Sequence, residues 1–390
     1  AARRTPPALA HPNDRMGRFA PMKQLWCVST LTLFAALGSV AAESDAQEAQ
    51  DDKARQWSVG PVRFKGLIDG YYSLNLNHPE SRQNQLRNFD VKANQFSLNM
   101  AELVLQHDPE PLGFRVDLGF GRAFDMIHAT EPAPNVFRNI LQAYVSYKPS
   151  KKSDFQVDFG KFVTGAGAEV VETHLNWNYS RSLLFALAIP YYHFGARATV
   201  PLHHHFTAGA MIVNGWNNVE DNNSGKTVGV TGTFHSPWFT WTNNYYVGPE
   251  WPGVDHGRRH LYDTTLLFNP SAKAAFYVNF DYGAEKNPAG NSRWLGVAGA
   301  ARLALSDRFA VTPRIEWFHD ANGFATGTAQ RLKEFTLTGE YKVASGVLTR
   351  LEYRRDWSDQ PFFERGSTPA TFRNQATVLI GFVAFFGPER

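Results

Sequence analysis

Cysteine is almost absent from this sequence of 390 residues, which contains one, Cys27, within an apolar N-terminal run. If that run is removed during export, as its composition indicates below, the remaining chain carries no thiol. This absence excludes disulfide bonds, thiol catalysis and cysteine-ligated metal sites from the remaining chain.

Long hydrophobic runs are also scarce. Apart from the N-terminal run, no segment approaches the roughly 20 apolar residues that a membrane-spanning helix needs, and the mean hydropathy is −0.35. The sequence is therefore not that of a helical membrane protein. It also lacks blocks of lysine and arginine interleaved with aromatic residues, which argues against nucleic-acid binding. The net charge of +3 favours no class of partner.

The apolar run follows a basic MKQ tripeptide, reads LWCVSTLTLFAALGSV and ends in two alanines. A basic start, about 16 apolar residues and small residues at the end are typical of a secretory signal peptide. We therefore predict that residues 1–42 are upstream sequence and signal peptide, and that the protein leaves the cytoplasm. A membrane anchor is the alternative. The acidic and polar residues 43–61 predict a flexible periplasmic lead-in.

Aromatic residues, in contrast, are abundant at 14% of the chain, and they occur within a repeating pattern. From Val62 onward, segments of about 9–14 residues alternate apolar and polar side chains between turn residues, which is the pattern of half-buried β-strands. No window shows a sustained helical period. The sequence predicts about sixteen strands, at 62–74, 93–107, 113–122, 136–147, 154–163, 191–201, 205–216, 225–235, 238–248, 259–268, 273–284, 292–305, 308–319, 331–343, 346–357 and 375–387.

The connections between these segments alternate in length. One set is short and turn-like: HDPEPL, KPSKKS, PLHH, HSPW, NPSAK, SDR and VASG. The other set is longer and polar: 75–92, 123–135, 164–190, 217–224, 249–258, 285–291, 320–330 and 358–374. Short turns at one rim and long loops at the other are typical of an outer-membrane barrel. We therefore predict an all-β fold, a transmembrane antiparallel β-barrel of about 16 strands over residues 62–390, with short periplasmic turns and long extracellular loops.

The alternation also predicts which face of each strand meets lipid. In the segment 346–357, Arg350, Glu352 and Arg354 share one face and mainly apolar residues share the other. An arginine at the bilayer midplane would cost roughly 2–4 kcal/mol, so the charged face must point inward. Because a dry core cannot hold many unpaired charges, we expect a wet interior. The pore-wall candidates are Lys65, Arg115, Asp117, Arg314, Glu316, Arg350, Glu352 and Arg354.

The longest connection, residues 164–190, interrupts the series of strands near its middle. A barrel of about sixteen strands leaves an aqueous channel unless something enters it. This loop carries Glu169, Glu172, His174 and Arg181, and opposed acidic and basic groups are how pores select ions. We expect the loop to fold inward and narrow a water-filled channel, with these four residues as constriction candidates. The alternative is a loop that caps the barrel from outside.

Several stretches of this sequence resemble a known family. They are FKGLIDGYYSLN in the first strand, NMAELVLQHDPEPLGFRVDLGFG across the first short turn, and FGKFVTGAGAE, NYSRSLLF and PYYHFGARATVPL around the long loop. From about Gly66 to the C-terminus the chain is similar to the OmpL-like β-barrel porins of Gram-negative bacteria. The resemblance implies an outer-membrane barrel that acts as a porin. It implies no particular substrate and no functional residues.

Two other functions stay open at the level of sequence. An outer-membrane lipid-active enzyme would need a serine and a histidine within hydrogen-bond reach on the lipid-facing rim. The candidates His174, His193, His260 and His319 show no such pairing, and no G-x-S-x-G motif occurs. A closed structural or adhesive barrel would instead have a lumen bridged by salt pairs. The leading interpretation is a passive channel for small hydrophilic solutes or ions, with no catalytic residues.

The expected partners are outer-membrane lipid and lipopolysaccharide, small hydrophilic solutes and the barrel-assembly machinery. We expect no nucleic acid, no cofactor and no metal site. The run His203 to His205 does not suggest a metal site, because adjacent side chains on a strand point to opposite faces. The sequence leaves both a monomer and a homotrimer open, and it leaves the charge preference of the channel open.

Overall fold

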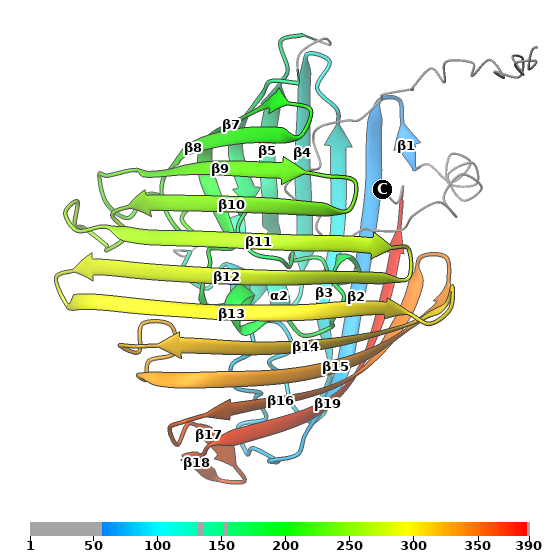
Figure 1. Ribbon diagram of the computed structural model, residues 1–390, viewed down its shortest axis with the longest axis vertical. Coiled ribbons are helices and arrows are strands. Elements are labelled where there is room, and N and C mark those ends of the chain that lie inside the picture. Colours follow the sequence, from blue (N-terminus) through cyan, green and yellow to red (C-terminus); the bar gives the residue numbers. More distant parts are fainter. Residues whose placement is uncertain (1–56, 132–135, 151–153, 388–390) are drawn as a thin grey trace, which may run out of the picture.

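The computed structural model describes residues 57–131, 136–150 and 154–387. The predicted signal peptide at 1–42 and most of the predicted lead-in at 43–61 lie outside the described residues. Sixteen antiparallel strands form a closed barrel, in which the last barrel strand pairs with the first (Figure 1). The predicted all-β transmembrane barrel is confirmed.

The barrel strands range from 8 to 15 residues in length, and they overlap all of the predicted segments. They are β2 (Val62–Asn75), β3 (Gln95–His107), β4 (Leu112–Phe120), β5 (Ile140–Tyr147), β6 (Gln156–Val163), β7 (Tyr192–His203), β8 (Phe206–Val213), β9 (Thr227–His235), β10 (Phe239–Gly248), β11 (Arg259–Ser271), β12 (Ala274–Asn287), β13 (Gly290–Ala304), β14 (Phe309–Asp320), β15 (Gln330–Ala344), β16 (Val347–Ser358) and β19 (Asn374–Phe386).

Several short helices and strands do not form part of the barrel wall. None of the helices in the described ranges is long and apolar enough to cross a membrane. A two-residue strand at the N-terminal end folds back onto β2, and the other short elements lie in the long connections. They are β1 (Ser58–Val59), α2 (Arg122–Ile127), η3 (Val136–Asn139), η4 (Thr173–Leu175), α3 (Leu183–Leu187), β17 (Phe363–Arg365) and β18 (Thr368–Phe372), where η marks a 3-10 helix.

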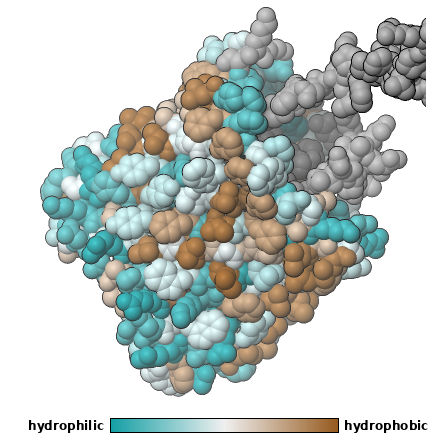
Figure 2. All heavy atoms as spheres, in the orientation of Figure 1, coloured by the Kyte–Doolittle hydropathy of each residue, from teal (hydrophilic) through white to brown (hydrophobic). Residues whose placement is uncertain are grey.

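Side chains alternate between the two faces of the barrel wall. On β16, Arg350 and Arg354 point inward and are each 1% exposed, whereas Leu351 points outward and is 61% exposed. In the face seen in Figure 2, apolar side chains lie over the middle of the strands, and hydrophilic side chains gather at the long-loop rim on the left. The charged face therefore points away from lipid, as the alternation predicts.

The structure differs from the prediction at one long connection. The sequence predicts a loop at 285–291, but β12 and β13 continue to a two-residue turn at Pro288 and Ala289. Polar composition alone favours a loop at this point. However, Glu285 keeps the alternation and points inward, where its Oε2 lies 3.1 Å from Nη2 of Arg259. An inward carboxylate that has a salt-bridge partner is compatible with a strand, so polar composition alone does not indicate a loop.

The last long connection also contains structure that the sequence does not predict. The segment 358–374 folds as the hairpin of β17 and β18, at the end of the barrel opposite the C-terminus (Figure 1). Its Glu364 accepts a hydrogen bond of 2.9 Å from the backbone N–H of Ser81, which joins the hairpin to the first long loop. The predicted strand at 136–147 is shorter than expected, because η3 precedes β5.

Placing an arginine on the lipid face should test the assigned facing. We expect Leu351→Arg to destabilise the folded barrel by about 2–4 kcal/mol, because a guanidinium near the bilayer midplane loses its hydration. Leu351→Ala, which keeps the site apolar, is the control. The measurement is urea-induced unfolding in lipid vesicles. Equal losses of stability in the two variants would contradict a lipid-facing Leu351.

Candidate functional site

Residues 164–190, here called the inner loop, contact the inner faces of strands on most sides of the barrel. The backbone N–H of Gly167 donates to Oδ2 of Asp263 on β11, at 3.0 Å. The indole N–H of Trp294 on β13 donates to the carbonyl of Ala188, at 3.1 Å. The ring of His174 stacks on Phe385 of β19, with 4.7 Å between the ring centroids. The inner loop therefore lies inside the barrel.

Irregular backbone at this depth needs hydrogen-bond partners, and Arg181 supplies several within the loop. Its guanidinium donates to the carbonyls of Val170, Val171 and Tyr179 at 2.9, 2.7 and 2.6 Å. The side chain of Ser182 accepts from the backbone N–H of Phe185, at 3.0 Å, and so caps the start of α3. Arg181 is thus a structural centre of the loop, and it is 1% exposed.

Charged side chains of β14 bind the inner loop near its start and in its second half. Arg314 donates to Oε1 of Glu169 and to the carbonyl of Ser180, both at 2.7 Å. Glu316 accepts from the backbone N–H groups of Leu183 and Leu184, at 2.8 and 3.3 Å. These two N–H groups begin α3 and have no partner within the helix. A carboxylate at this position satisfies them and adds a charge-assisted contact.

Charged side chains of β16 bind the same loop through its backbone. Arg350 donates to the carbonyls of Thr173 and Asn176, the former at 2.7 Å. Arg354 donates to the carbonyl of Arg181, at 2.6 Å. Glu352 lies between these arginines in sequence and accepts from the N–H groups of Tyr179 and Ser180, at 2.6 and 3.0 Å. The wall thus offers donors and acceptors that match the carbonyls and N–H groups of the loop.

Asp69, on β2, also anchors the inner loop. Strand β2 is the neighbour of β19 on the side away from β16. Its carboxylate accepts from the hydroxyls of Tyr179 and Thr173 at 2.6 and 2.5 Å, and from Nδ2 of Asn99 at 2.6 Å. Gly381 on β19 gives the Tyr179 ring its space, since a Cβ atom there would lie 2.4 Å from ring atoms. A buried carboxylate with three donors is fully satisfied by hydrogen bonds.

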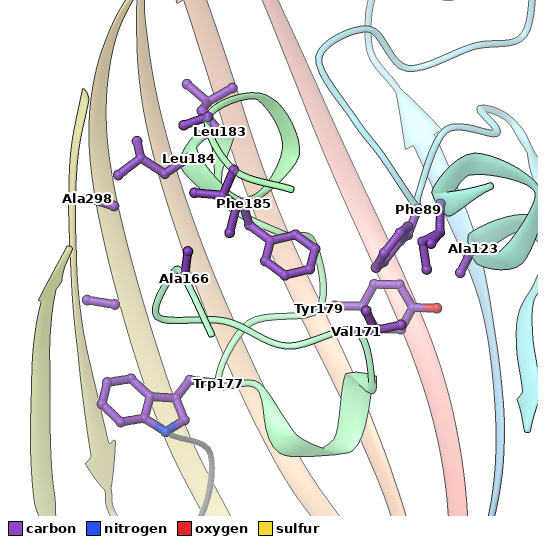
Figure 3. Close-up of a cluster of buried hydrophobic side chains, with 14 of the residues drawn as sticks. Phe89, Ala123, Ala166, Val171, Trp177, Tyr179, Leu183, Leu184, Phe185 and Ala298 are labelled. Carbon is purple, nitrogen blue, oxygen red and sulfur yellow. The ribbon is translucent and has the colours of Figure 1, made fainter. Parts of the chain in front are cut away.

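Apolar side chains complete the contact between the inner loop and the wall. Figure 3 shows the loop passing in front of the strands, with Leu184 directed toward Ala298 of β13. Trp177 packs on Tyr277 of β12, with ring centroids 5.2 Å apart. Phe89, from the first long loop, packs on Phe185 at 5.9 Å. Aromatic pairs at these separations add about 0.5–1.5 kcal/mol each beyond area burial.

A cavity of about 30 Å³, lined by both charged and apolar side chains, lies on the remaining side, between the inner loop and strands β4 to β7. Such a volume has room for about one or two water molecules. The side chains of Arg115 and Arg197 keep 16% and 13% exposure there, and that of Glu172 keeps 10%. The wall contributes Arg115, Gln142, Tyr144 and Arg197, and the loop and its flanking residues contribute Val163, Thr164, Gly165, Ala166, Gly167, Glu169, Val170, Val171, Glu172, Phe185 and Tyr191.

A family model described as "Putative beta-barrel porin-2, OmpL-like" matches residues 61–386. The chain belongs to this family. The predicted resemblance to OmpL-like porins is confirmed, and the family together with the barrel fold makes this an outer-membrane protein. No curated protein sequence matches this porin-family chain significantly.

Solved structures that resemble this porin-family member share its fold at low sequence identity. The anion-selective porin from Comamonas acidovorans has a TM-score of 0.56 and 10% identity, over 83% of this chain and 99% of that one. OprB of Pseudomonas putida has a TM-score of 0.57 and 10% identity, over 88% and 97%. OmpT, an outer membrane protein of Vibrio cholerae, has a TM-score of 0.56 and 13% identity, over 85% and 100%.

The structure divides the predicted pore-wall residues of this porin into two groups. Arg314, Glu316, Arg350, Glu352 and Arg354 point inward but are covered by the inner loop, to which all five are bound. The expectation that water surrounds these charges is therefore wrong for this group, because they have protein partners.

The second group consists of Lys65, Arg115 and Asp117, of which Arg115 lines the cavity. The guanidinium of Arg115 donates through Nε to both carboxylate oxygens of Asp117, at 2.9 and 3.0 Å. Lys65 is half-buried near the start of β2, and its charge acts on His174. The cavity therefore keeps Arg115 in contact with the remaining space, whereas Asp117 is fully buried beside it.

The four constriction candidates also differ in where they lie. Glu172 borders the cavity, with Oε1 3.6 Å from Nη2 of Arg115, and burial raises its pKa. Glu169 lines the same cavity while bound to Arg314. His174 lies away from it, and burial, with the charges of Lys65 and Arg350, lowers the pKa of His174 to about 3. The imidazole is therefore neutral at pH 7.

Sequence reasoning did not single out Arg197 or Asp69. Arg197 lies on the inward face of β7, donates to Asp158 at 2.8 Å, and covers the ring of Phe162 at 4.4 Å. The alternation along β7 could have identified it as an inward cation. The alternation along β2 also places Asp69 on the inward face, together with Lys65, but its partners Thr173 and Tyr179 in the inner loop lie more than 100 positions away.

Lys161 lies on the lipid-facing parity of β6, a position at which the sequence pattern predicts either a side chain that reaches the rim or a bulge. In the structure Lys161 is 2% exposed, with Nζ 3.7 Å from Oε1 of Glu131 and 4.0 Å from the ring centroid of Tyr192. The long connection that carries Glu131 thus covers the ammonium group and supplies its counter-charge.

Removing the charge of Glu352 should loosen the inner loop. We expect Glu352→Gln to destabilise the docked loop by about 1–3 kcal/mol, since two buried N–H groups lose a charged acceptor. Hydrogen exchange at residues 176–182 should speed up. Glu364→Gln, in the extracellular hairpin, is the matched control and should leave that exchange unchanged. Unaltered exchange in Glu352→Gln would show that the carboxylate does not hold the loop.

Proposed function

We propose that this protein is a passive channel for small hydrophilic solutes or ions, and that the inner loop narrows it. The observation that carries the proposal is the cavity between the inner loop and β4 to β7, where Arg115, Arg197 and Glu172 keep partial exposure. Membership of a porin family supports a channel. So does the similarity in fold to an anion-selective porin and to OprB.

The size of the cavity limits what could pass while the loop is docked. A cavity of about 30 Å³ admits about one or two water molecules. Partly dehydrated ions and the smallest solutes fit such a passage, and larger solutes would require the loop to move. Loop contacts are concentrated on β14, β16 and β2, so displacement would begin most readily at the β4 to β7 side.

The charges that border the cavity have both signs. Arg115 and Arg197 belong to the wall, whereas Glu169 and Glu172 belong to the loop. A passing ion would therefore meet a transverse field between wall and loop. Such a field orders water and polar solutes and makes the passage selective by charge.

A closed structural or adhesive barrel is the second candidate, and one specific observation favours it. Buried ion pairs span the interior, such as Arg314 with Glu169 at 2.7 Å and Arg87 with Asp356 at 2.6 Å. Conductance across planar lipid bilayers separates the two candidates. Stepwise current increments from the purified, folded protein support the channel. Silence from protein shown to be inserted overturns it and supports the closed barrel.

We also propose that the protein is not an enzyme. Two of the histidines considered for lipid hydrolysis have other partners: Nδ1 of His193 lies 3.0 Å from the carbonyl of Gly215, and Nδ1 of His260 lies 2.7 Å from the Tyr245 hydroxyl. In each case the Nδ1 atom of the imidazole therefore contacts a group other than a serine nucleophile.

The proposed partners are small hydrophilic solutes, outer-membrane lipid, lipopolysaccharide and the barrel-assembly machinery. A homotrimer remains a proposal, which cross-linking of the protein in native outer membranes would test.

Deleting residues 168–186 should raise single-channel conductance several-fold, because the deletion removes the segment that fills the interior. The control is deletion of 362–372, which removes the extracellular hairpin and leaves the inner loop in place. The measurement is single-channel current in symmetrical KCl. Equal conductance in the two deletions would exclude the inner loop as the constriction.

Removing a wall cation should shift ion preference. We expect Arg197→Gln to move the reversal potential across a KCl gradient toward that of a more cation-selective channel, because one positive charge leaves the border of the cavity. Lys226→Gln, at an exposed loop position, is the control and should shift it less. A shift of the same size in both would mean that Arg197 does not border the conducting path.

A further inference from the structure

Three carboxylates from separate segments meet beside the cavity. Glu102 comes from β3, Asp117 from β4 and Glu172 from the inner loop, and one oxygen of each lies within 4.8 Å of the others. All three residues are buried, at 7%, 0% and 7% exposure. Like charges so close together and away from water repel strongly unless a cation or a proton lies among them.

The cations of the protein do not fully satisfy this group. Arg115 binds Asp117 through Nε and lies 3.6 Å from Glu172. Lys65 and Arg181 act as nearby charges, on Glu102 and on Glu172 respectively. These cations nevertheless leave one carboxylate oxygen of the group without a hydrogen bond.

A second observation is independent of the clustering itself. Glu102 is 93% buried, and its Oε1 atom is removed from water without a hydrogen-bond partner. A carboxylate oxygen that is removed from water without a partner is costly. Both oxygens of Asp117, in contrast, accept hydrogen bonds, from Arg115 and from Gln142. Oε1 of Glu102 is therefore the oxygen of this group that no described residue uses.

We propose that Glu102, Asp117 and Glu172 bind one Ca²⁺ ion, which clamps the inner loop to the β3–β4 wall. Oxygens within 4.8 Å of one another can all ligate one ion at the 2.3–2.6 Å typical of calcium. Carboxylates are the ligands that Ca²⁺ prefers, and waters from the adjoining cavity can complete a coordination number of six to eight. The clamp would act on the side where the loop has few other anchors.

Binding of the ion does not depend on the proposed channel, but its effect on conductance rests on that proposal. A loop held against β3 and β4 cannot swing away from the cavity, so Ca²⁺ would keep the passage in its narrow state. Removal of Ca²⁺ would then free the loop edge at Glu172. Extracellular calcium would in this way set the width of the channel.

Isothermal titration of Ca²⁺ into folded protein in detergent, free of lipopolysaccharide, tests the site. We expect one saturable site in the wild type and an affinity about tenfold or more weaker in Glu102→Gln and in Glu172→Gln. Glu285→Gln, which changes a buried wall carboxylate outside the group, is the matched control and should bind as the wild type does. Glu172→Gln leaves the barrel wall unaltered, so it tests the site if Glu102→Gln fails to fold.

Wild-type protein that takes up no Ca²⁺, or undiminished binding in Glu102→Gln and Glu172→Gln, would overturn the proposal. Weakening of equal size in Glu285→Gln would also overturn it, because the effect would then not be specific to the group. Hydrogen exchange at residues 168–176 should slow on addition of Ca²⁺ to the wild type and to Glu285→Gln but not to Glu102→Gln or Glu172→Gln, and no slowing in the wild type would overturn the clamp. None of these experiments measures current. Absence of Ca²⁺ binding would therefore leave the proposed channel function untouched, and a barrel that conducts no ions could still bind Ca²⁺.

Discussion

The barrel interior depends on one constraint: a polar group that leaves water must find another partner. The inner loop brings irregular backbone to membrane depth, which is tolerated only where protein or a wet cavity surrounds it. The wall brings arginines and glutamates that lipid would reject. The backbone groups of the loop and the charged side chains of the wall therefore serve as hydrogen-bond partners for one another. Arg350 meets carbonyls of the loop, and Glu352 meets its N–H groups.

The hydrogen bonds between the loop and the wall are distributed unevenly around the barrel. Strands β14 and β16, together with Asp69 on β2, hold the loop by many short hydrogen bonds. Strands β4 to β7 face it across a small cavity instead. The loop is thus bound directly to one side of the barrel wall and separated from the other by this cavity. Position in the circumference, more than charge alone, decides whether an inward arginine serves as an anchor or borders the cavity.

Much of the fold could be predicted from the sequence, because strand facing is a local property. The alternation at Arg350, Leu351 and Arg354 determines which side each residue occupies, and no distant contact is needed to infer it. Loop composition was a weaker guide. Polar residues such as Glu285 extend a strand when they have a partner in the wall.

The candidate site could be predicted only in part, because its contacts join distant segments. Alternation places Arg314 inward but cannot show that Glu169, 145 positions away, will neutralise it. It shows Glu102 and Asp117 as separate inward acids, whereas their meeting with Glu172 depends on the path of the inner loop. Arg197 follows the same rule, since the pattern gives its inward position but not its neighbours Asp158 and Phe162.

The anchors of the inner loop have a consequence for how such a barrel can diversify. Arg350, Arg354, Glu316 and Glu352 recognise mainly peptide groups of the loop, and peptide groups are common to every amino acid. At these contacts the path of the loop is independent of which side chains it carries, whereas Arg181, Thr173 and Tyr179 hold it through their own side chains. Mutation can therefore exchange other loop residues that border the cavity while the scaffold stays fixed, so that the lining of the cavity can change without a new fold.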